Sequence, residues 1–348
     1  MQQPGSPREV HALESSAGPL ARAYDVTMLD LDGVVYRGDG AVAGAAEALA
    51  EARGTTTLAF VTNNASRPPA AVAQKLTGMG VPADDGDVVT SAQAAARMVS
   101  EVVPAGSTVL VVGGEGLEVA LAELGLRSTR TLDDDPKAVV QGFHPSLGWE
   151  LLAEGAYGVA AGLPWIASNT DLTVPTARGV APGNGTLVAA IGAATGRTPD
   201  VAGKPRAPLF EETVLRVGGR HPLMVGDRLD TDIEGANVVG ADSLFVLTGV
   251  NTLDDAVAAD PLRRPTYVST DLAGLLHPHP EVVTDGGSVT CGGVRIDDDG
   301  SVDVGDATGA AGATCLLRAA LTRGWARADA GSSPDLGPVH DALTAMLG

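Results

Sequence analysis

Cysteine and aromatic residues are scarce in this sequence. Only Cys291 and Cys315 are cysteines among the 348 residues, and aromatic residues make up 3% of the chain. Two cysteines far from any Cys-x-x-Cys spacing exclude a disulfide scaffold and a cysteine-rich zinc site. With so few aromatic side chains, the core must be built mostly from alanine, valine and leucine.

Basic residues are also few, because 23 lysines and arginines face 43 acidic residues and give a formal net charge of -20. A negative field of this size repels phosphate backbones and anionic lipid at long range. We therefore expect neither a nucleic acid nor a membrane among the partners. An anionic substrate would need a local positive site, such as a metal ion or a helix N-terminus.

Long hydrophobic runs are absent from the sequence. No run reaches the roughly 18 apolar residues that a membrane helix needs, and Arg8, Glu9, His11 and Glu14 interrupt the region where a signal peptide would be apolar. We expect a cytoplasmic protein. The 44% of hydrophobic residues is ample for a large core, and the length predicts about two domains with room for a third small unit.

Apolar runs of strand length alternate with helix-length segments over most of the chain. This alternation is typical of βα units on a parallel sheet. Strands are expected at 26–29, 58–61, 108–112, 138–141, 165–168, 222–225 and 244–247. Helices are expected at 66–79, 91–103, 117–124, 149–154, 187–194, 208–217 and 232–239.

The last part of the chain has a different pattern. Residues 282–304 alternate around glycine-rich turns and predict a short hairpin, whereas 310–327 and 335–347 are expected to be helical. Pro278 and Pro280 mark a linker before this segment. The pattern predicts a small α+β C-terminal extension.

Two carboxylates follow the first expected strand, in the segment Asp30-Leu31-Asp32-Gly33. Gly33 permits a tight turn that lets both side chains face one small volume. One carboxylate can attack phosphorus, and the second can deliver a proton to the leaving oxygen. An isolated segment of this kind is also a common solvated acidic turn.

A second polar segment, Thr62-Asn63-Asn64, follows the next expected strand. A hydroxyl and backbone N–H groups at a helix entrance are suited to binding phosphate oxygens. A helix N-cap followed by a turn is the alternative interpretation.

Lys204 and Asp227 complete the set of candidate residues. Lys204 precedes the helix expected from residue 208 and can neutralise a phosphoryl group, although most single lysines are simply solvated. Asp227 follows the strand at 222–225 and could share a Mg²⁺ ion with Asp30, because this cation prefers hard oxygen ligands. Asp232 lies five residues further along.

These four segments, in this order and at these strand ends, resemble the four motifs of the haloacid dehalogenase superfamily. The resemblance implies an α/β fold with a Rossmann-like doubly wound parallel sheet. It implies Asp30 as nucleophile and Asp32 as general acid/base, with Mg²⁺ held by Asp30, Asp227 and the backbone carbonyl of Asp32. The roles implied for the other positions are phosphate binding by Thr62 and Asn63, charge neutralisation by Lys204, and support from Gly33, Asn64 and Asp232.

The insertion between Thr62 and Lys204 is far longer than one βα crossover needs. An α/β cap at this point resembles the subfamily of nitrophenyl, pyridoxal and phosphoglycolate phosphatases, over residues 24–278. The resemblance implies that a closed cap excludes water and presents Asn169 and Asp171 to the leaving group, although a turn after a strand would also explain these two residues. We expect a flexible segment at 1–23, a catalytic core at 24–91 and 201–278, a cap at 92–200 and the C-terminal extension at 279–348.

An acid at position 32 distinguishes phosphatases from dehalogenases and transport ATPases of this superfamily. We therefore expect a Mg²⁺-dependent phosphomonoesterase acting on a small phosphorylated metabolite. The C-terminal extension resembles that of actinobacterial glycerol 3-phosphate phosphatases, which favours glycerol 3-phosphate and an enzyme of glycerophospholipid metabolism. Phosphoglycolate or a nucleoside monophosphate remains an alternative substrate, a non-catalytic phosphometabolite-binding protein is an alternative of another class, and a homo-oligomer could form through the cap or the extension.

Overall fold

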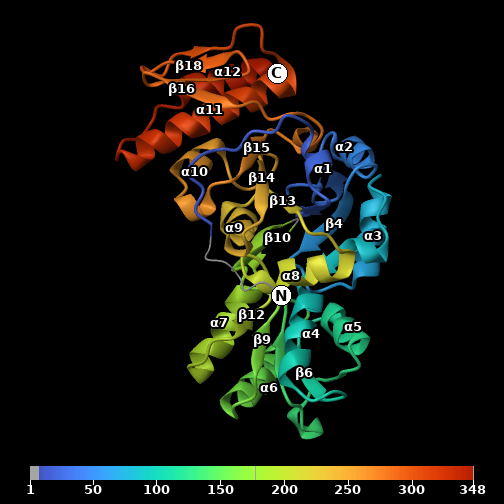
Figure 1. Ribbon diagram of the computed structural model, residues 1–348. Helices are drawn as coiled ribbons and strands as arrows, with labels where there is room; N and C mark the ends of the chain where they lie inside the picture. Colours follow the sequence, from blue (N-terminus) through green and yellow to red (C-terminus); the bar gives the residue numbers. More distant parts are fainter. Residues whose placement is uncertain (1–7, 177, 348) are drawn as a thin grey trace. The chain divides into compact units, whose positions relative to one another are not determined.

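The computed structural model describes residues 8–176 and 178–347. These residues divide into two compact units (Figure 1). The first unit comprises the described residues up to 59, then 79–81 and those from 219 onward, and the second comprises 60–78 and the described residues of 82–218. The domain boundaries expected from the sequence stay a prediction.

The first unit begins with α1 (Leu20–Ala23), β1 (Val26–Leu29), the small hairpin β2 (Tyr36–Arg37) and β3 (Gly40–Ala41), and α2 (Ala45–Ala52). After the chain returns it contains β13 (Pro222–Gly226), η3 (Leu229–Ile233), α9 (Glu234–Val239), β14 (Asp242–Val246), α10 (Leu253–Ala258), η4 (Pro261–Arg263), β15 (Tyr267–Ser269) and η5 (Leu272–Leu275). The extension then adds β16 (Val282–Asp285), β17 (Ser288–Cys291), β18 (Val294–Ile296), β19 (Val302–Asp303), α11 (Gly309–Asp329) and α12 (Gly337–Leu347).

A parallel sheet forms the centre of the first unit. Its strand order is β15-β14-β13-β1, continued by β4 (Thr57–Thr62) and β5 (Val88–Thr90), and the division between the units falls within β4. All four residues of β1 are buried, as are the last four of β13 and of β14. Burial of both faces explains why these strands are nearly continuous apolar runs, and the parallel sheet expected from the sequence is confirmed.

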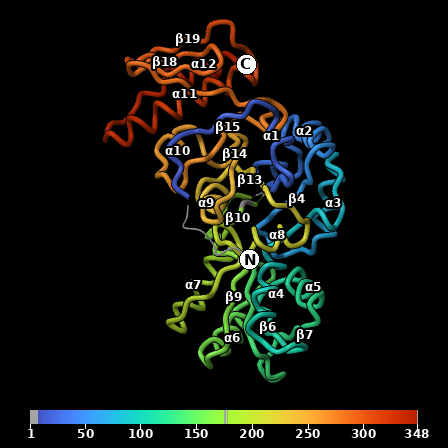
Figure 2. Tube along the Cα trace, in the orientation of Figure 1, coloured from blue at the N-terminus to red at the C-terminus, as the bar shows by residue number. Residues whose placement is uncertain are grey.

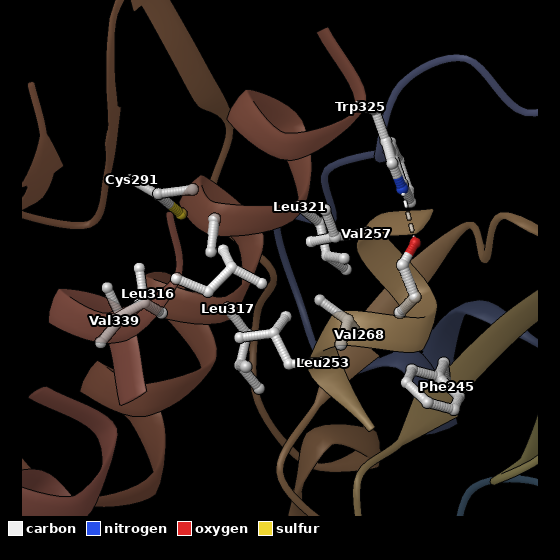
Figure 3. Close-up of a cluster of buried hydrophobic side chains, with 14 of the residues drawn as sticks. Phe245, Leu253, Val257, Val268, Cys291, Leu316, Leu317, Leu321, Trp325 and Val339 are labelled. Carbon is white, nitrogen blue, oxygen red and sulfur yellow. Dashed lines mark hydrogen bonds between the residues drawn. The ribbon is translucent and has the colours of Figure 1, made fainter. Parts of the chain in front are cut away.

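The C-terminal extension packs on one side of the first unit. Its strands form an antiparallel sheet in the order β16-β17-β18-β19, so the expected hairpin is part of a four-stranded sheet. Helix α11 contacts β17 and β18 and also packs against α10 and β15. In Figure 2, α11 runs between the labelled strand β18 and the segment that contains α10 and β15. One hydrophobic cluster therefore runs from Phe245 and Val268 of the main sheet to Leu317 and Leu321 of α11 (Figure 3).

Polar contacts complete this junction. The Trp325 indole donates to the carbonyl oxygen of Ala256 at 2.8 Å, and the Arg264 guanidinium lies over the Trp325 ring while pairing with both oxygens of Asp329. Of the segment 1–23 that we expect to be flexible, residues 1–7 lie outside the described residues. In the remainder, the Ser16 amide donates to the carbonyl oxygen of His279 at 2.8 Å.

The second unit contains the end of β4, then α3 (Pro69–Gly78), η1 (Asp85–Asp87), β5, α4 (Ser91–Val102), β6 (Thr108–Val112), α5 (Glu115–Glu123), β7 (Arg127–Thr129), η2 (Leu132–Asp134) and β8 (Val139–Gln141). It continues with α6 (Trp149–Ala160), β9 (Trp165–Ala167), β10 (Thr173–Thr176), β11 (Gly179–Pro182), α7 (Asn184–Thr195), β12 (Asp200–Val201) and α8 (Ala207–Val217). A parallel sheet in the order β12-β9-β8-β6-β7 packs against α6 and α7 through Val112, Val139 and Ile191.

Several expected helix starts differ from the structure: the helices expected from 117 and 187 begin at Glu115 and Asn184, and two others begin later than expected. The helix expected from residue 66 begins at Pro69, because Asn64 accepts hydrogen bonds from both the amide and the hydroxyl of Ser66 and shapes a loop there. The helix expected from Asp232 begins at Glu234 and is preceded by a π-helical turn, in which the Asp232 carboxylate accepts from the Arg228 amide at 3.2 Å. Within the described ranges, no helix combines the length and the hydropathy that crossing a bilayer requires.

Candidate active site

Three carboxylates of the first unit converge at the carboxyl end of its parallel sheet. β1 pairs with β13 so that Leu29 lies beside Val225, and the Asp30 amide donates to the Val225 carbonyl oxygen at 2.9 Å. This register brings Asp30 and Asp227 to the same edge. Oxygen atoms of Asp30, Asp227 and Asp232 all lie within 4.8 Å of one another, and Asp227 and Asp232 are completely buried.

Glycines allow these carboxylates to approach the backbone closely. A Cβ atom on Gly249 would lie 1.7 Å from Oδ2 of Asp227, and one on Gly33 would lie 2.4 Å from the same oxygen. A Cβ atom on Gly226 would lie 2.2 Å from the Cβ of Asp232. The glycine in Asp30-Leu31-Asp32-Gly33 therefore has a second role besides its positive φ, because it leaves space for the Asp227 carboxylate.

Asp227 is also fixed by the segment that follows β14. The Val250 amide donates to Asp227 Oδ2 at 2.6 Å, and the Thr248 hydroxyl donates to the Gly33 carbonyl oxygen at 2.6 Å. The loop after β14 thus ties the loop after β1 to the carboxylate that follows β13. Sequence reasoning missed Thr248 and Gly249, although their position just beyond a fourth parallel strand was a usable signal.

The Asp32 side chain lies in a different environment from this cluster. Asp32 is exposed, and the Tyr36 hydroxyl donates to its Oδ2 at 3.3 Å. Tyr36 is itself 6% exposed and is held in the same turn, where the Gly33 amide donates to the Tyr36 carbonyl oxygen at 2.8 Å. An exposed carboxyl group positioned by a buried tyrosine is available for proton transfer.

The acidic cluster fits a Mg²⁺ ion. Its donors are carboxylate oxygens, which this cation prefers, and one oxygen of each of the three residues lies within 4.8 Å of the others. Asp30 and Asp227 are the ligands that sequence reasoning expected. Asp232 was expected only to support the site, but its carboxylate lies in the same cluster. Asp32 was expected to contribute its backbone carbonyl to the metal ion, and its side chain is not part of the cluster.

Asn63 organises a second polar cluster, in the second unit. Its Oδ1 accepts from the Lys204 amide at 2.8 Å, and its Nδ2 donates to the Lys204 carbonyl oxygen at 3.1 Å. Nδ2 also lies 3.3 Å from both carboxylate oxygens of Asp171. The Asn63 carbonyl oxygen accepts from the Ser91 hydroxyl at 2.5 Å and from Asn169 Nδ2 at 2.6 Å.

The segment containing Asn169 and Asp171 is an ordered turn. Asn169 Oδ1 accepts from the Asp171 amide at 3.1 Å, and the Asn169 carbonyl oxygen accepts from Asn184 Nδ2 at 2.7 Å. The structure thus unites Asn63, Asn169, Asp171 and Lys204, which the sequence separates widely. Contact of Asn169 and Asp171 with a leaving group stays a prediction.

Lys204 and Thr62 are both buried in this cluster. Lys204 is 3% exposed, and its Nζ donates to the Val61 carbonyl oxygen at 3.4 Å. The Thr62 hydroxyl accepts from the Asn64 amide at 3.0 Å. Thr62 is the last residue of β4 and, because α3 begins only at Pro69, Asn63 and Asn64 lie in the loop after β4 rather than at the helix entrance expected from the sequence.

Comparison with known families and proteins agrees with this geometry. The family model described as haloacid dehalogenase-like hydrolase matches residues 27–127, and a second model of haloacid dehalogenase-like hydrolases matches residues 201–275. The D-glycerol 3-phosphate phosphatase of Mycobacterium tuberculosis is 46% identical over 297 residues, which cover 82% of this chain and 84% of the relative. The chain belongs to the haloacid dehalogenase-like hydrolases. The family expected from its four motifs is confirmed.

Solved structures of other haloacid dehalogenase-like hydrolases extend the similarity. A calcium complex of glycerol phosphate phosphatase from Mycobacterium tuberculosis has a TM-score of 0.80 and 41% identity, and covers 94% of this chain and 98% of its own. The same protein has been solved with magnesium, with a TM-score of 0.77, 43% identity and coverage of 88% and 92%. The 4-nitrophenylphosphatase of Thermotoga maritima has a TM-score of 0.68 and 30% identity, and covers 74% of this chain and 97% of its own. The expected fold class, with its Rossmann-like core and its cap, is confirmed.

Proposed function

We propose that this chain is a Mg²⁺-dependent phosphomonoesterase that works through an aspartyl-phosphate on Asp30. The observation that carries this proposal is the convergence of Asp30, Asp227 and Asp232, whose carboxylate oxygens lie within 4.8 Å of one another. A nucleophilic carboxylate at the end of β1, with two buried carboxylates beside it, suits attack on a phosphoryl group once a divalent cation offsets their charge.

In the first half of the reaction, an oxygen of Asp30 attacks phosphorus and the bond to the alcohol oxygen breaks. Asp32 gives its proton to that oxygen, so the alcohol leaves as a neutral molecule. Tyr36 orients the Asp32 carboxyl group through its 3.3 Å hydrogen bond. In the second half, Asp32 takes a proton from water, which attacks the aspartyl-phosphate and releases inorganic phosphate.

Charge neutralisation is divided between the metal ion and the second cluster. Mg²⁺ held by Asp30, Asp227 and Asp232, with the Asp32 carbonyl oxygen as a further ligand, supplies the positive charge that brings an anionic nucleophile and a phosphate together. Thr62 and the Asn63 backbone bind phosphate oxygens, and the Lys204 ammonium group neutralises negative charge on the transferred phosphoryl group. The Asn63 side chain fixes the Lys204 backbone through hydrogen bonds with the Lys204 amide and the Lys204 carbonyl oxygen.

The proposed substrate is glycerol 3-phosphate. Two observations support it: 46% identity to a relative named D-glycerol 3-phosphate phosphatase, and a structural match to a glycerol phosphate phosphatase over 94% of this chain. The 4-nitrophenylphosphatase covers 74% of this chain, whereas the glycerol phosphate phosphatase covers 94%. The match to the glycerol phosphate phosphatase therefore includes more of the chain than the core and the cap. A place in glycerophospholipid metabolism follows from this substrate. Phosphoglycolate and nucleoside monophosphates are not favoured over it.

A small phosphorylated metabolite is the partner that fits a phosphatase of this family. A homo-oligomer formed through the cap or the extension stays a prediction, as does a cytoplasmic location. The alternative function is that of a non-catalytic protein that binds a phosphorylated metabolite without hydrolysing it.

The test is phosphate release by the purified full-length protein from glycerol 3-phosphate, phosphoglycolate and a nucleoside monophosphate, with Mg²⁺ and with a chelator. Glycerol 3-phosphate should give the highest kcat/KM, and chelation should abolish release. Asp30→Asn should lower kcat by about three orders of magnitude or more with the fold intact, whereas Asp133→Asn, at an exposed position in the second unit, should not. Release by Asp30→Asn at the wild-type rate would contradict the mechanism, and no release from any substrate would favour the binding protein.

A further inference from the structure

The chain's two cysteines lie together inside the C-terminal extension. Cys291 ends β17 and Cys315 lies on α11, which packs against β17. Their exposed fractions are 1% and 8%, and neither is in a disulfide. The two thiols are close enough that each shifts the pKa of the other. Figure 3 shows Cys291 with its sulfur directed toward α11.

One of the two thiols borders a cavity. A cavity of about 270 Å³ is lined by residues of β15, of the linker before β16 and of α11, among them Ser269, His279, Thr314 and Cys315. The other sulfur, that of Cys291, approaches the Pro280 carbonyl oxygen at 3.7 Å. A small molecule in the cavity would therefore meet Cys315 first, with Cys291 behind it.

A buried arginine lies near both thiols. Arg318 is fully buried; its Nε donates to the Pro280 carbonyl oxygen at 3.1 Å and its Nη2 to the Glu14 carbonyl oxygen at 2.7 Å. Within the described residues its Nη1 has no hydrogen-bond partner. Both acceptors are neutral carbonyl groups, so a carboxylate does not offset the guanidinium charge there. A buried cation in this situation stabilises an adjacent thiolate.

The pKa values of the two thiols move apart because of their mutual interaction, whereas Arg318 lowers both. The interaction with Cys291 and the charge of Arg318 lower the pKa of Cys315. The interaction with Cys315, together with burial, raises the pKa of Cys291. Cys315, which borders the cavity and has the lowered pKa, is thus the better placed nucleophile of the pair.

We propose that Cys315 is a modification site for small disulfides, and that Cys291 resolves the adduct. The Cys315 thiolate attacks one sulfur of the small disulfide, breaks its S–S bond and releases one small thiol, leaving a mixed disulfide on Cys315. The Cys291 thiol then loses its proton and attacks the Cys315 sulfur, and the second small thiol leaves. The two cysteines are oxidised, the small disulfide is reduced to two thiols, and those thiols carry away the two protons.

The product would join β17 to α11 covalently. Because α11 also packs against α10 and β15, this bond would connect the extension's sheet to the helix that anchors it to the main sheet. The site is separate from Asp30, Asp227 and Asp232, so it does not depend on the proposed phosphatase mechanism.

The test treats the native full-length protein with bis(2-hydroxyethyl) disulfide and follows it by intact-mass and peptide mass spectrometry. The wild type should lose the mass of two hydrogens and yield a Cys291–Cys315 peptide. Cys291→Ser should instead accumulate one mercaptoethanol adduct at Cys315, and Cys315→Ser should react at least about tenfold more slowly than Cys291→Ser.

Peptide mapping of the wild type keeps the proposal testable even if a serine variant fails to fold. The proposal is overturned if the native wild type stays fully reduced while the urea-unfolded protein reacts at both cysteines. It is also overturned if Cys291 takes the adduct as fast as Cys315. Neither measurement depends on phosphate release, so a failure of the proposed phosphatase activity would be distinguishable.

Discussion

The Asn63 side chain makes two hydrogen bonds with the backbone of Lys204. Its Oδ1 accepts from the Lys204 amide at 2.8 Å, and its Nδ2 donates to the Lys204 carbonyl oxygen at 3.1 Å. One side-chain amide thereby fixes a loop 141 residues away in the sequence. Gly203, just before Lys204, allows this approach, since a Cβ atom there would lie 2.6 Å from Asn63 Oδ1. Asn63 is thus a positioning residue for the lysine that we propose neutralises the phosphoryl group.

Asn63→Ala should lower kcat/KM for glycerol 3-phosphate by about 10- to 100-fold, because the Lys204 loop loses both hydrogen bonds that fix it. Gln74→Ala is the control: Gln74 is an exposed amide side chain on α3, so activity should stay near wild type. Steady-state kinetics on both variants, with circular dichroism to verify folding, make the comparison. Equal losses in the two variants would argue against a specific role for Asn63.

Gly249→Ala should weaken Mg²⁺ binding, since a Cβ atom would lie 1.7 Å from Asp227 Oδ2 and must displace that carboxylate. The expected result is a rise of about tenfold or more in the Mg²⁺ concentration that gives half-maximal activity. Gly86→Ala, where nothing lies within 4 Å of the added atom, serves as the control. An unchanged Mg²⁺ dependence in Gly249→Ala would count against Asp227 as a ligand.

Tyr36→Phe should slow the release of a poor leaving group more than that of a good one. Without the phenol hydroxyl, the Asp32 carboxyl group is held less well for donating its proton, so kcat for glycerol 3-phosphate should fall about threefold to tenfold. For nitrophenyl phosphate, whose leaving group needs little protonation, kcat should stay near wild type. Tyr157→Phe, at an exposed position on α6, is the control. A uniform loss with both substrates would remove this role from Tyr36.

Buried His279 should make the protein less stable in mild acid. Burial lowers its pKa from 6.5 to about 4, while its Nε2 stays within 2.9 Å of the Gly274 carbonyl oxygen. Between these two values the unfolded chain binds the proton and the folded one does not, so the free energy of unfolding falls as pH drops from 6.5 to 4. The total loss is about 3 kcal/mol.

Urea unfolding across this pH window measures the effect. His279→Asn should be less stable at neutral pH but should have a shallower slope between pH 6.5 and 4, whereas the exposed His11→Asn should keep the wild-type slope. Identical slopes in wild type and His279→Asn would show that other groups cause the acid sensitivity.

The parallel sheet and its polar strand ends could be predicted from the sequence because both depend on local patterns. Buried parallel strands are apolar throughout, and the residues after them, such as Asp30 and Asp227, lie at one edge whatever the rest of the fold does. The starts of α3 and α9 were wrong because side chains of Asn64 and Asp232 bind nearby backbone amides and delay each helix, which apolar periodicity does not reveal.

The order of polar residues along the chain was enough to assign the family and to predict roles for Asp30 and Asp32, because strand ends and residue types are local properties. Only the folded chain decided that Asp232 joins the carboxylate cluster, that Asn63 holds Lys204, and that Cys291 lies against Cys315. These are contacts between segments far apart or around an irregular turn. They depend on register, on the space that glycines leave and on burial, and none of these is encoded in a short stretch of sequence.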